Sequence, residues 1–302
     1  MNKAIYLFVV VILAVSSFLF GRSTVNTQIS GEYPLLAQRI LIDNPNDAIV
    51  NFSSLRESIS AYMTENSIGG SVYFEYLPTG TSIRITGDTE LVAASLMKIP
   101  VVMDLYKAAE LGRIDLDSTV ELREEWLDSR YGQLYLRGAG YGISYREAAK
   151  LAMIDSDNTA YAAILFSTNK LLSVDENSIS ASDVSFSRDS TNEILISARS
   201  YTSFLKCLYF GCFVNFEHSQ EILGYLSQSA YKDQLKAGIP ESIKLAHKIG
   251  TFSDTTQSDC GIVYVEKRNY AICVMLKTDS LSANEYISDI SKLAYDYIEG
   301  LK

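Results

Sequence analysis

The sequence predicts an α+β fold, in which an antiparallel sheet is flanked by helices and carries an inserted all-helical lobe. Runs with strand character lie towards both ends of the folded part, at residues 71–86 and 243–276. Between them, apolar side chains recur at helical spacing. A sheet assembled from the two ends of a chain leaves the helical middle as an insertion.

The first element is an uncharged apolar segment of 17 residues, 4–20, between Lys3 and Arg22. This length is the lower limit for a membrane-spanning helix and also suits a signal peptide. No small-x-small cleavage pattern or following cysteine stands out, so an uncleaved anchor is favoured over a cleaved signal; a merely apolar core segment is the third alternative. We expect residues 1–21 to be this signal-anchor or signal peptide, with the bulk of the chain exported.

Residues 22–45 are polar and interrupted by Pro34 and Pro45, which predicts a linker or lead-in. The remaining residues, 46–302, are near the upper limit of size for one hydrophobic core, and we expect one monomeric domain. The domain opens with a helix over 52–66, where apolar residues have helical spacing. A hairpin follows, because β-rich runs at 71–76 and 81–86 flank a Pro/Gly turn.

The middle of the chain is predominantly helical. The apolar spacing predicts a helix over 91–111, a buried helix or helix pair over 145–166, and further helices over 197–210 and 219–235. Residues 172–194 are rich in Ser, Asp and Asn, and this composition predicts the longest loop of the chain. The chain then ends with strands over 243–250, 261–266 and 270–276, a turn at 266–269 and a closing helix over 282–299.

Composition excludes several classes of protein. Lys and Arg number 26 against 36 Asp and Glu, a net charge of −10, which argues against nucleic-acid binding because phosphate contacts need clustered cations. Hydrophobic residues at 47% exclude wholesale disorder. Four Cys and two His are too few for a typical zinc site, so we expect no metal and no cofactor. If the protein is an enzyme, its catalytic side chains must therefore be Ser, Lys, Asp, Glu or Asn.

Export would permit disulfides. Cys207 and Cys212 could pair if the chain turns at Gly211, whereas Cys260 and Cys273 could pair only if their strands are neighbours. Four buried thiols are the alternative, since free cysteine behaves as a small apolar residue.

The clearest chemical candidate is Ser95 with Lys98, an S-x-x-K pair at the start of an apolar helix. Residues three apart share one helix face, and apolar surroundings lower the pKa of a lysine. A neutral Lys98 could take the hydroxyl proton of Ser95 and make it a nucleophile without histidine. The same spacing also begins at Ser167, Ser203 and Ser229, but only Ser95 stands at a buried helix start.

Two later motifs accompany this pair. Ser156, Asp157 and Asn158 end an apolar run, where they could equally be a helix cap. The segment 247–251 reads His-Lys-Ile-Gly-Thr and closes a strand, where an ordinary edge strand is the alternative.

Together these motifs resemble the penicillin-binding protein and class A β-lactamase superfamily, whose signature is S-x-x-K, S-D-N and K-T-G. Ser95 and Ser156 are 61 positions apart, and Ser156 and Lys248 are 92 apart. The resemblance covers roughly residues 50–300 and includes the segment 259–264. It is closer to the class A-like serine hydrolases than to the large transpeptidases.

The resemblance implies an acyl-enzyme route on a β-lactam or on a D-Ala-D-Ala peptide of the cell wall. Ser95 would be the nucleophile and Lys98 its base, while Ser156 would relay a proton to the departing nitrogen. The substrate would be held by the remaining motif residues. These are Asn158 for the substrate amide, Lys248 for Ser156 and the substrate carboxylate, and Gly250 with Thr251 on the strand, the N–H groups of Ser95 and Thr251 forming the oxyanion hole.

Two departures from the family pattern affect the expected activity. Ile249 replaces the hydroxyl residue that binds the substrate carboxylate. The loop 172–194 lacks the Glu-x-x-x-Asn pattern of the deacylating glutamate, and Glu176 and Glu193 are its only glutamates. These two are therefore the only candidates for the deacylating residue. If neither activates the water, acylation with slow turnover follows, which is the behaviour of a penicillin-binding peptidase.

Two alternatives stay open at this point. One is a catalytically retired module that binds wall peptides, which Ile249 and the missing glutamate favour. The other is a structural α+β domain with coincidental motifs. Tyr131 and Tyr135 lie between the first two motifs, where the resemblance implies residues that line the cleft. In a chain with 20 tyrosines, ordinary packing is the favoured interpretation.

Overall fold

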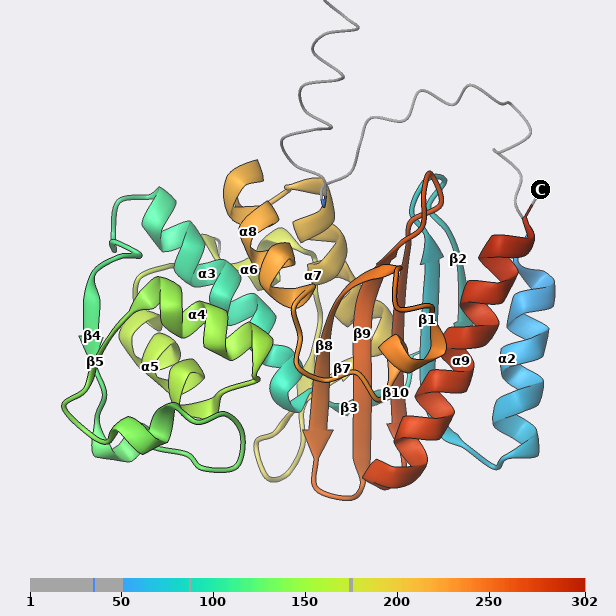
Figure 1. Cartoon of the computed structure of the whole chain (residues 1–302), viewed down its shortest axis with the longest axis horizontal. Coiled ribbons are helices and arrows are strands. Elements are labelled where there is room, and N and C mark those ends of the chain that lie inside the picture. The colour runs from blue at the N-terminus through green and yellow to red at the C-terminus, as the bar shows by residue number, and fades with distance from the viewer. Residues whose placement is uncertain (1–34, 36–50, 87, 174–175, 302) are drawn as a thin grey trace, which may run out of the picture.

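The computed structural model describes residues 35, 51–86, 88–173 and 176–301. Their largest sheet is antiparallel and has the strand order β2-β1-β10-β9-β8 (Figure 1). Its strands come from both ends of the domain, as the sequence predicts. They are β1 (Gly69–Tyr76), β2 (Thr81–Ile85), β8 (Lys244–Phe252), β9 (Thr256–Tyr264) and β10 (Tyr270–Lys277).

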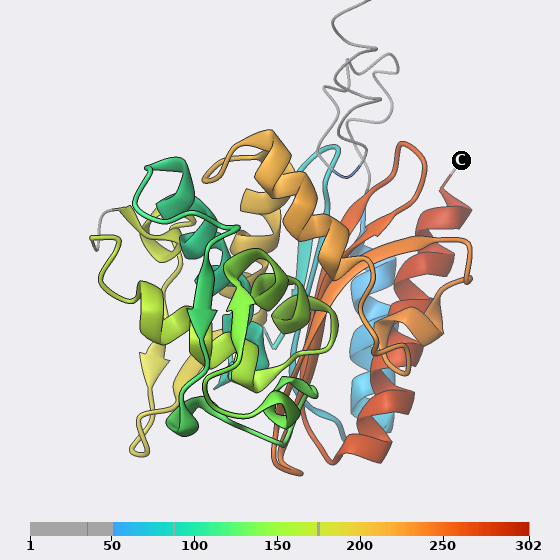
Figure 2. The same cartoon turned by 60° about the vertical axis from the view of Figure 1, so that its left-hand side comes forward.

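Helices α2 (Ser53–Glu65) and α9 (Ser280–Gly300) cover one face of this sheet (Figures 1 and 2). Their apolar stripes, which include Leu55, Ile59 and Ile287, form one buried cluster with inward-facing strand residues such as Phe74. The burial follows from the helical spacing of these residues, because i, i+3 and i+4 positions share a face.

The opposite face carries α7 (Ala198–Phe210) and, beyond it, the inserted lobe (Figure 2). The lobe contains α3 (Lys98–Glu110), α4 (Tyr145–Ile154), α5 (Asn158–Thr168), α6 (Ser178–Ala181), α8 (Phe216–Leu226) and a short pair of strands, β4 (Thr119–Glu121) and β5 (Gly142–Ser144). One continuous apolar cluster joins the lobe, α7 and the sheet. The predicted α+β architecture with an inserted, mainly helical lobe is therefore confirmed.

Several predicted boundaries are wrong. The helix expected over 91–111 is a strand, β3 (Glu90–Val92), then a 3-10 turn (Ala94–Met97), and only then α3. Strand β3 pairs with β7 (Ile194–Ser197), a partner so distant that no local pattern reveals it. Of the two alternatives for 145–166, the helix pair is correct, because the chain breaks between α4 and α5.

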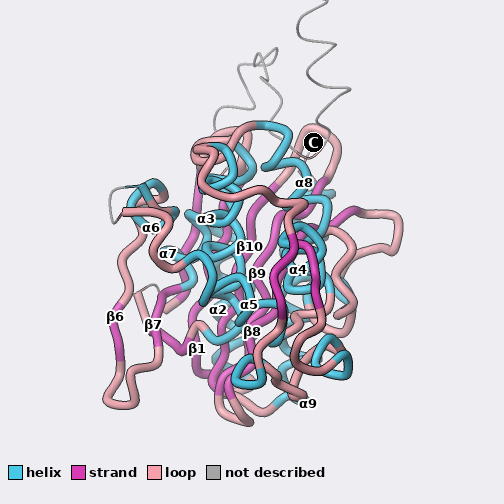
Figure 3. The backbone as a smooth tube through the Cα atoms, turned by 90° about the vertical axis from the view of Figure 1, so that its left-hand side faces the viewer, coloured by secondary structure: helices cyan, strands magenta, loops and turns pink. Residues whose placement is uncertain are grey.

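The loop predicted over 172–194 contains α6, β6 (Ser187–Arg188) and the start of β7. Strands β6 and β7 lie side by side (Figure 3), and β3 pairs with the other edge of β7 to complete a small second sheet. The helix predicted over 219–235 is α8, which begins earlier because Asn215 caps it by accepting the His218 N–H at 2.8 Å. It ends at Leu226, and a loop with a 3-10 turn (Leu235–Gly238) follows. The strand predicted over 261–266 is the longer β9, whose pairing with β8 extends it towards the N-terminus.

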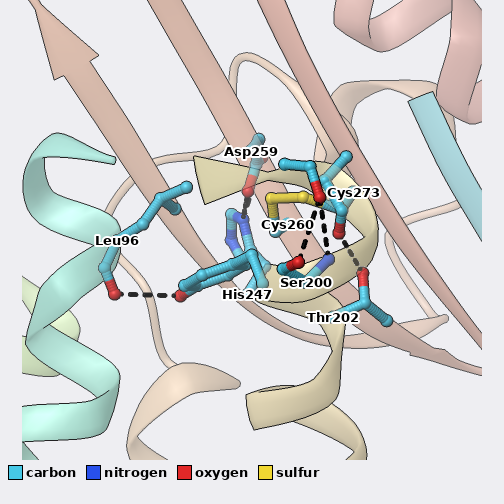
Figure 4. Close-up of a disulfide and its surroundings, with 10 residues drawn as sticks. Leu96, Ser200, Thr202, His247, Asp259, Cys260 and Cys273 are labelled. Atoms are coloured by element: carbon cyan, nitrogen blue, oxygen red, sulfur yellow. Dashed lines mark hydrogen bonds and ion pairs between the residues drawn. A yellow bond between two sulfur atoms is a disulfide. The ribbon is translucent and has the colours of Figure 1, made fainter. Parts of the chain in front are cut away.

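The cysteines form disulfides, so the alternative of four buried thiols is wrong. Cys207 joins Cys212 around Gly211, which has a left-handed backbone (φ 62°) and makes the turn that the pairing requires. Cys260 joins Cys273, its direct cross-strand partner on β10 (Figure 4).

The predicted anchor at 1–21 lies outside the described residues, as does the predicted linker at 22–45 apart from Leu35. Within the described ranges, no helix has the length and apolar character needed to cross a membrane.

Candidate active site

Ser95 lies in the 3-10 turn that leads into α3, and Lys98 is the first residue of that helix. The Lys98 Nζ donates to the Ser95 Oγ at 2.8 Å. Ala94, directly before the serine, has a left-handed backbone (φ 46°), which is uncommon for a residue with a side chain. Such conformations concentrate at functional sites, where packing holds them in place.

The Lys98 ammonium group is almost enclosed, with only 2% of the residue exposed. Besides Ser95, its acceptors are the Ser156 carbonyl at 2.8 Å, the Ser156 Oγ at 3.1 Å and the Asn158 Oδ1 at 2.7 Å. Burial lowers the pKa of Lys98 to about 7, although the negative charges of Asp157 and Asp128 oppose the shift. A large fraction of Lys98 is therefore neutral near pH 7 and can accept a proton.

Ser156 lies between the two lysines of the site. Its Oγ accepts from the Lys248 Nζ at 2.8 Å as well as from Lys98, and the residue is fully buried. Its backbone is also left-handed (φ 54°), which breaks the chain between α4 and α5. Asp157 then caps α5 by accepting the Ala160 N–H at 2.8 Å. The alternative that the S-D-N motif is a helix cap is therefore correct for Asp157.

Lys248 projects from β8 and is 1% exposed. Burial lowers its pKa well below the ordinary value; the neighbouring charge of Lys98 lowers it further, and Asp259 opposes the shift. Whichever of the two lysines carries a proton places a positive charge beside Ser156, although the chain as a whole is acidic.

Gly250 explains how β8 reaches this site. A Cβ atom there would lie 2.8 Å from the Leu96 Cγ and 2.9 Å from the Ala93 carbonyl oxygen. Only glycine lets the strand pass this close to the turn that carries Ser95. The following residue on the same strand, Thr251, lines the cavity above Ser95.

The cavity at Ser95 has a volume of about 490 Å³. Four predicted site residues line it, and they are Ser95, Lys98, Asn158 and Thr251. Ser156 and Lys248 lie behind them as buried hydrogen-bond partners. Ile249, only 7% exposed, does not line the cavity. A larger cavity of about 890 Å³ adjoins Asp157 and is lined by neither Ser95 nor Lys98, so the smaller cavity is the candidate site.

Residues outside the three motifs also line this cavity. Asp128 and Arg130 form a pair, in which the Arg130 Nε donates to both Asp128 carboxylate oxygens at 3.0 and 3.1 Å. This pairing lowers the pKa of Asp128 to about 2, and the Asn158 side chain donates to the same carboxylate. Tyr131 also lines the cavity and is not merely a packing residue. Asp128 and Arg130 lie in a loop without a recognisable motif, so nothing in the sequence marks them. The position of Tyr131 between the first two motifs, where the family often lines its cleft, was a signal for that residue.

The two candidate glutamates have different surroundings. Glu176 is bound by Arg113 at 2.7 Å and accepts the Ser173 N–H at 3.0 Å, and it does not line the Ser95 cavity. Glu193 does line it. In the part of the chain that the structure describes, no carboxylate hydrogen-bonds to Ser95 or Lys98.

Comparison with known proteins agrees with this geometry. A family model described as "Beta-lactamase enzyme family" matches residues 54–298. The chain belongs to this family. The resemblance inferred from the three motifs is thereby confirmed. No curated protein matches the sequence.

Solved structures of the beta-lactamase family share the fold. PBP-A superposes with a TM-score of 0.74 at 22% identity, over 82% of this chain and 97% of that one. A β-lactamase from Sphaerobacter thermophilus DSM 20745 superposes with a TM-score of 0.74 at 20% identity, over 84% of this chain and 100% of that one. An ancestral class A β-lactamase superposes with a TM-score of 0.72 at 19% identity, over 80% of this chain and 99% of that one.

Proposed function

We propose that this protein is a serine acyltransferring hydrolase that opens β-lactam amides or D-Ala-D-Ala-type peptide bonds through an acyl group on Ser95. The observation that carries the proposal is the 2.8 Å contact between Ser95 and a buried Lys98 whose pKa is about 7, inside a cavity. A lysine in this state can act as a general base at neutral pH.

In the proposed reaction, the Ser95 Oγ loses its proton to the Lys98 Nζ and attacks the carbonyl carbon. The oxyanion is stabilised by the N–H groups of Ser95 and Thr251, both of which are cavity residues. The C–N bond then breaks, and Ser156 gives its proton to the departing nitrogen. Lys98, 3.1 Å from the Ser156 Oγ, returns a proton to it.

Water must then hydrolyse the Ser95 ester to release the acid and regenerate the serine. The absence of a carboxylate hydrogen-bonded to Ser95 or Lys98 in the described residues supports slow release. We therefore favour a penicillin-binding peptidase over a fast β-lactamase. A solved structure of a PBP-A mutant is an acyl-enzyme complex with penicillin G, which supports capture of a covalent adduct in this fold.

The compartment is part of the same proposal. The two disulfides fit an oxidising environment, and a wall substrate requires export. We propose that residues 4–20 anchor the exported domain in the membrane and that the protein acts as a monomer on the stem peptide of peptidoglycan.

The test is intact-mass spectrometry of the full-length protein in mild detergent, incubated with penicillin G. An adduct that persists for hours on the wild type and is absent from Ser95→Ala supports the proposal. Ser203→Ala is the matched control, because Ser203 starts the same S-x-x-K spacing on α7, outside the cavity. An adduct that disappears as the drug is consumed would indicate a β-lactamase. Absence of any adduct, together with no cleavage of a D-Ala-D-Ala peptide, would indicate the retired binding module.

A further inference from the structure

A second polar cavity, of about 270 Å³, lies at the start of β8 and shares no lining residue with the Ser95 cavity. Its walls come from the end of α8, the loop with the 3-10 turn and the first strand residues. The polar side chains among its lining residues are Ser227, Ser229, Lys232, Lys236, Glu241, Ser242, Lys244 and His247.

The lining has an excess of hydrogen-bond donors and of positive charge. Three lysines face one carboxylate, that of Glu241, in a chain whose net charge is −10. A concave surface lined by one sign of charge concentrates ions of the opposite sign. The cavity is therefore suited to an anion, against the charge of the protein as a whole.

The floor of the cavity is preorganised. His247 and Ser229 are 3% and 7% exposed. The His247 Nδ1 contacts the Asp259 carboxylate oxygens at 2.8 and 3.0 Å, which fixes the ring (Figure 4). Asp259 is itself held, because it accepts the Leu235 N–H at 3.1 Å. Since the carboxylate can only accept, Nδ1 carries the proton, and Nε2 is the ring nitrogen left to meet a ligand. It accepts from a P–OH group when the ring is neutral and donates to a phosphate oxygen when the ring is protonated.

The hydroxyl of Ser229 completes this floor. Its Oγ accepts the Tyr231 N–H at 3.4 Å, so its own proton can be donated to a ligand.

One lysine shapes the wall. The Lys236 Nζ donates to the carbonyl oxygens of Pro240, Glu241 and Ile243 at 3.1, 2.9 and 2.7 Å. These bonds close the loop into a ring and keep a positive charge at the cavity. Lys236 therefore adds to the positive electrostatic potential of the cavity. Direct contacts with a bound anion must come from other residues.

Lys232 and Lys244 supply those contacts. Both are exposed, and Lys232 lies 3.6 Å from Glu241, whose side chain is 81% exposed. An exposed ion pair at this distance is weak, so a stronger anion can displace Glu241 at little cost. Lysine ammonium groups act as point charges that suit phosphate oxygens.

We propose that this cavity is a phosphate-binding site, floored by His247 and Ser229 and closed by Lys232 and Lys244. The ligand is a phosphate group, either free or as the phosphodiester of a larger molecule. The site is independent of the reaction proposed at Ser95.

The test uses proton NMR of the histidine rings, because the chain has only two histidines, His218 and His247. Inorganic phosphate is titrated into the full-length protein at constant ionic strength, with chloride as the reference anion. We expect a saturable shift of the His247 ring signals while those of His218 stay in place. His218→Gln assigns the signals, since only His247 then remains.

Two double variants distinguish a specific phosphate site from nonspecific attraction of phosphate to surface lysines. Lys232→Gln with Lys244→Gln should weaken the phosphate affinity at least tenfold. Lys170→Gln with Lys267→Gln removes the same charge from exposed positions outside the cavity and should leave it within twofold. Equal weakening in both pairs, a shift that does not saturate, or an equal shift of His218 would overturn the proposal.

A parallel titration with bis-glycerol phosphodiester distinguishes the two sources of phosphate. Binding of both compounds indicates a phosphodiester ligand, whereas binding of inorganic phosphate alone indicates free phosphate or a monoester. Binding of neither overturns the site. Because the readout is a ring signal, the result does not depend on whether Ser95 is acylated.

Discussion

Replacing Lys98 with arginine tests the proposed base directly. Arginine keeps the positive charge but cannot lose its proton in a protein. With the pKa of Lys98 at about 7, half of the lysine is neutral at pH 7. A lysine with the ordinary value of 10.5 would be about 0.03% neutral, so burial increases the base form about 10³-fold. Lys98→Arg should therefore lower the acylation rate by more than about 10³-fold.

The wild type should show the matching pH dependence. In the proposed mechanism the active form is deprotonated Lys98, so the acylation rate should rise with pH, about tenfold per unit below pH 7, and level off above the pKa of about 7. The assay is the second-order rate of penicillin G adduct formation between pH 5 and pH 9, followed by intact mass.

Lys206→Arg is the matched control, because Lys206 belongs to another S-x-x-K spacing and forms a partly buried ion pair with Glu75 at 2.8 Å, away from the Ser95 cavity. Its rate should equal that of the wild type. Lys98→Met fills a similar volume without charge and provides a second test if the arginine variant does not fold. It should be equally inactive. An arginine variant within tenfold of the wild type, or a flat pH profile, would refute the role of Lys98 as base.

Three further predictions concern recognition, turnover and stability. Because Ile249 is buried and does not line the Ser95 cavity, Ile249→Thr should leave kcat/KM for carboxylate-bearing substrates within about twofold; a rise of about 10- to 150-fold in steady-state assays, the effect of a hydrogen bond worth about 1.5–3 kcal/mol, would show that position 249 reaches the substrate carboxylate. Glu193→Gln should leave the adduct lifetime within about twofold, and an extension beyond tenfold by intact mass would instead identify Glu193 as the water-activating base. Cys260→Ala with Cys273→Ala should cost about 3 kcal/mol and lower the Tm by about 6–12 °C in calorimetry; no change would show that this disulfide does not stabilise the sheet.

Much of the fold was predictable because its signals are local. The periodicity of Leu55 and Ile59 predicts α2, and the Pro/Gly turn after Tyr76 predicts the first hairpin, since both patterns depend on neighbouring residues only. The same holds for the Ser95–Lys98 spacing. Errors arose where pairing is long-range: β3 needs β7 as its partner, and no pattern near Glu90–Val92 reveals one.

The sequence by itself determined the composition of the candidate site, namely one serine, two lysines and the S-D-N motif, together with the family to which the chain belongs. The tertiary structure decided what those residues can do. It buried Lys98 to 2% exposure, brought Ser156 between two lysines, and placed Asp128 and Arg130 in the same cavity. The reason is physical: a pKa depends on desolvation and on charges that approach only in the folded chain, so no spacing along the sequence can encode its value.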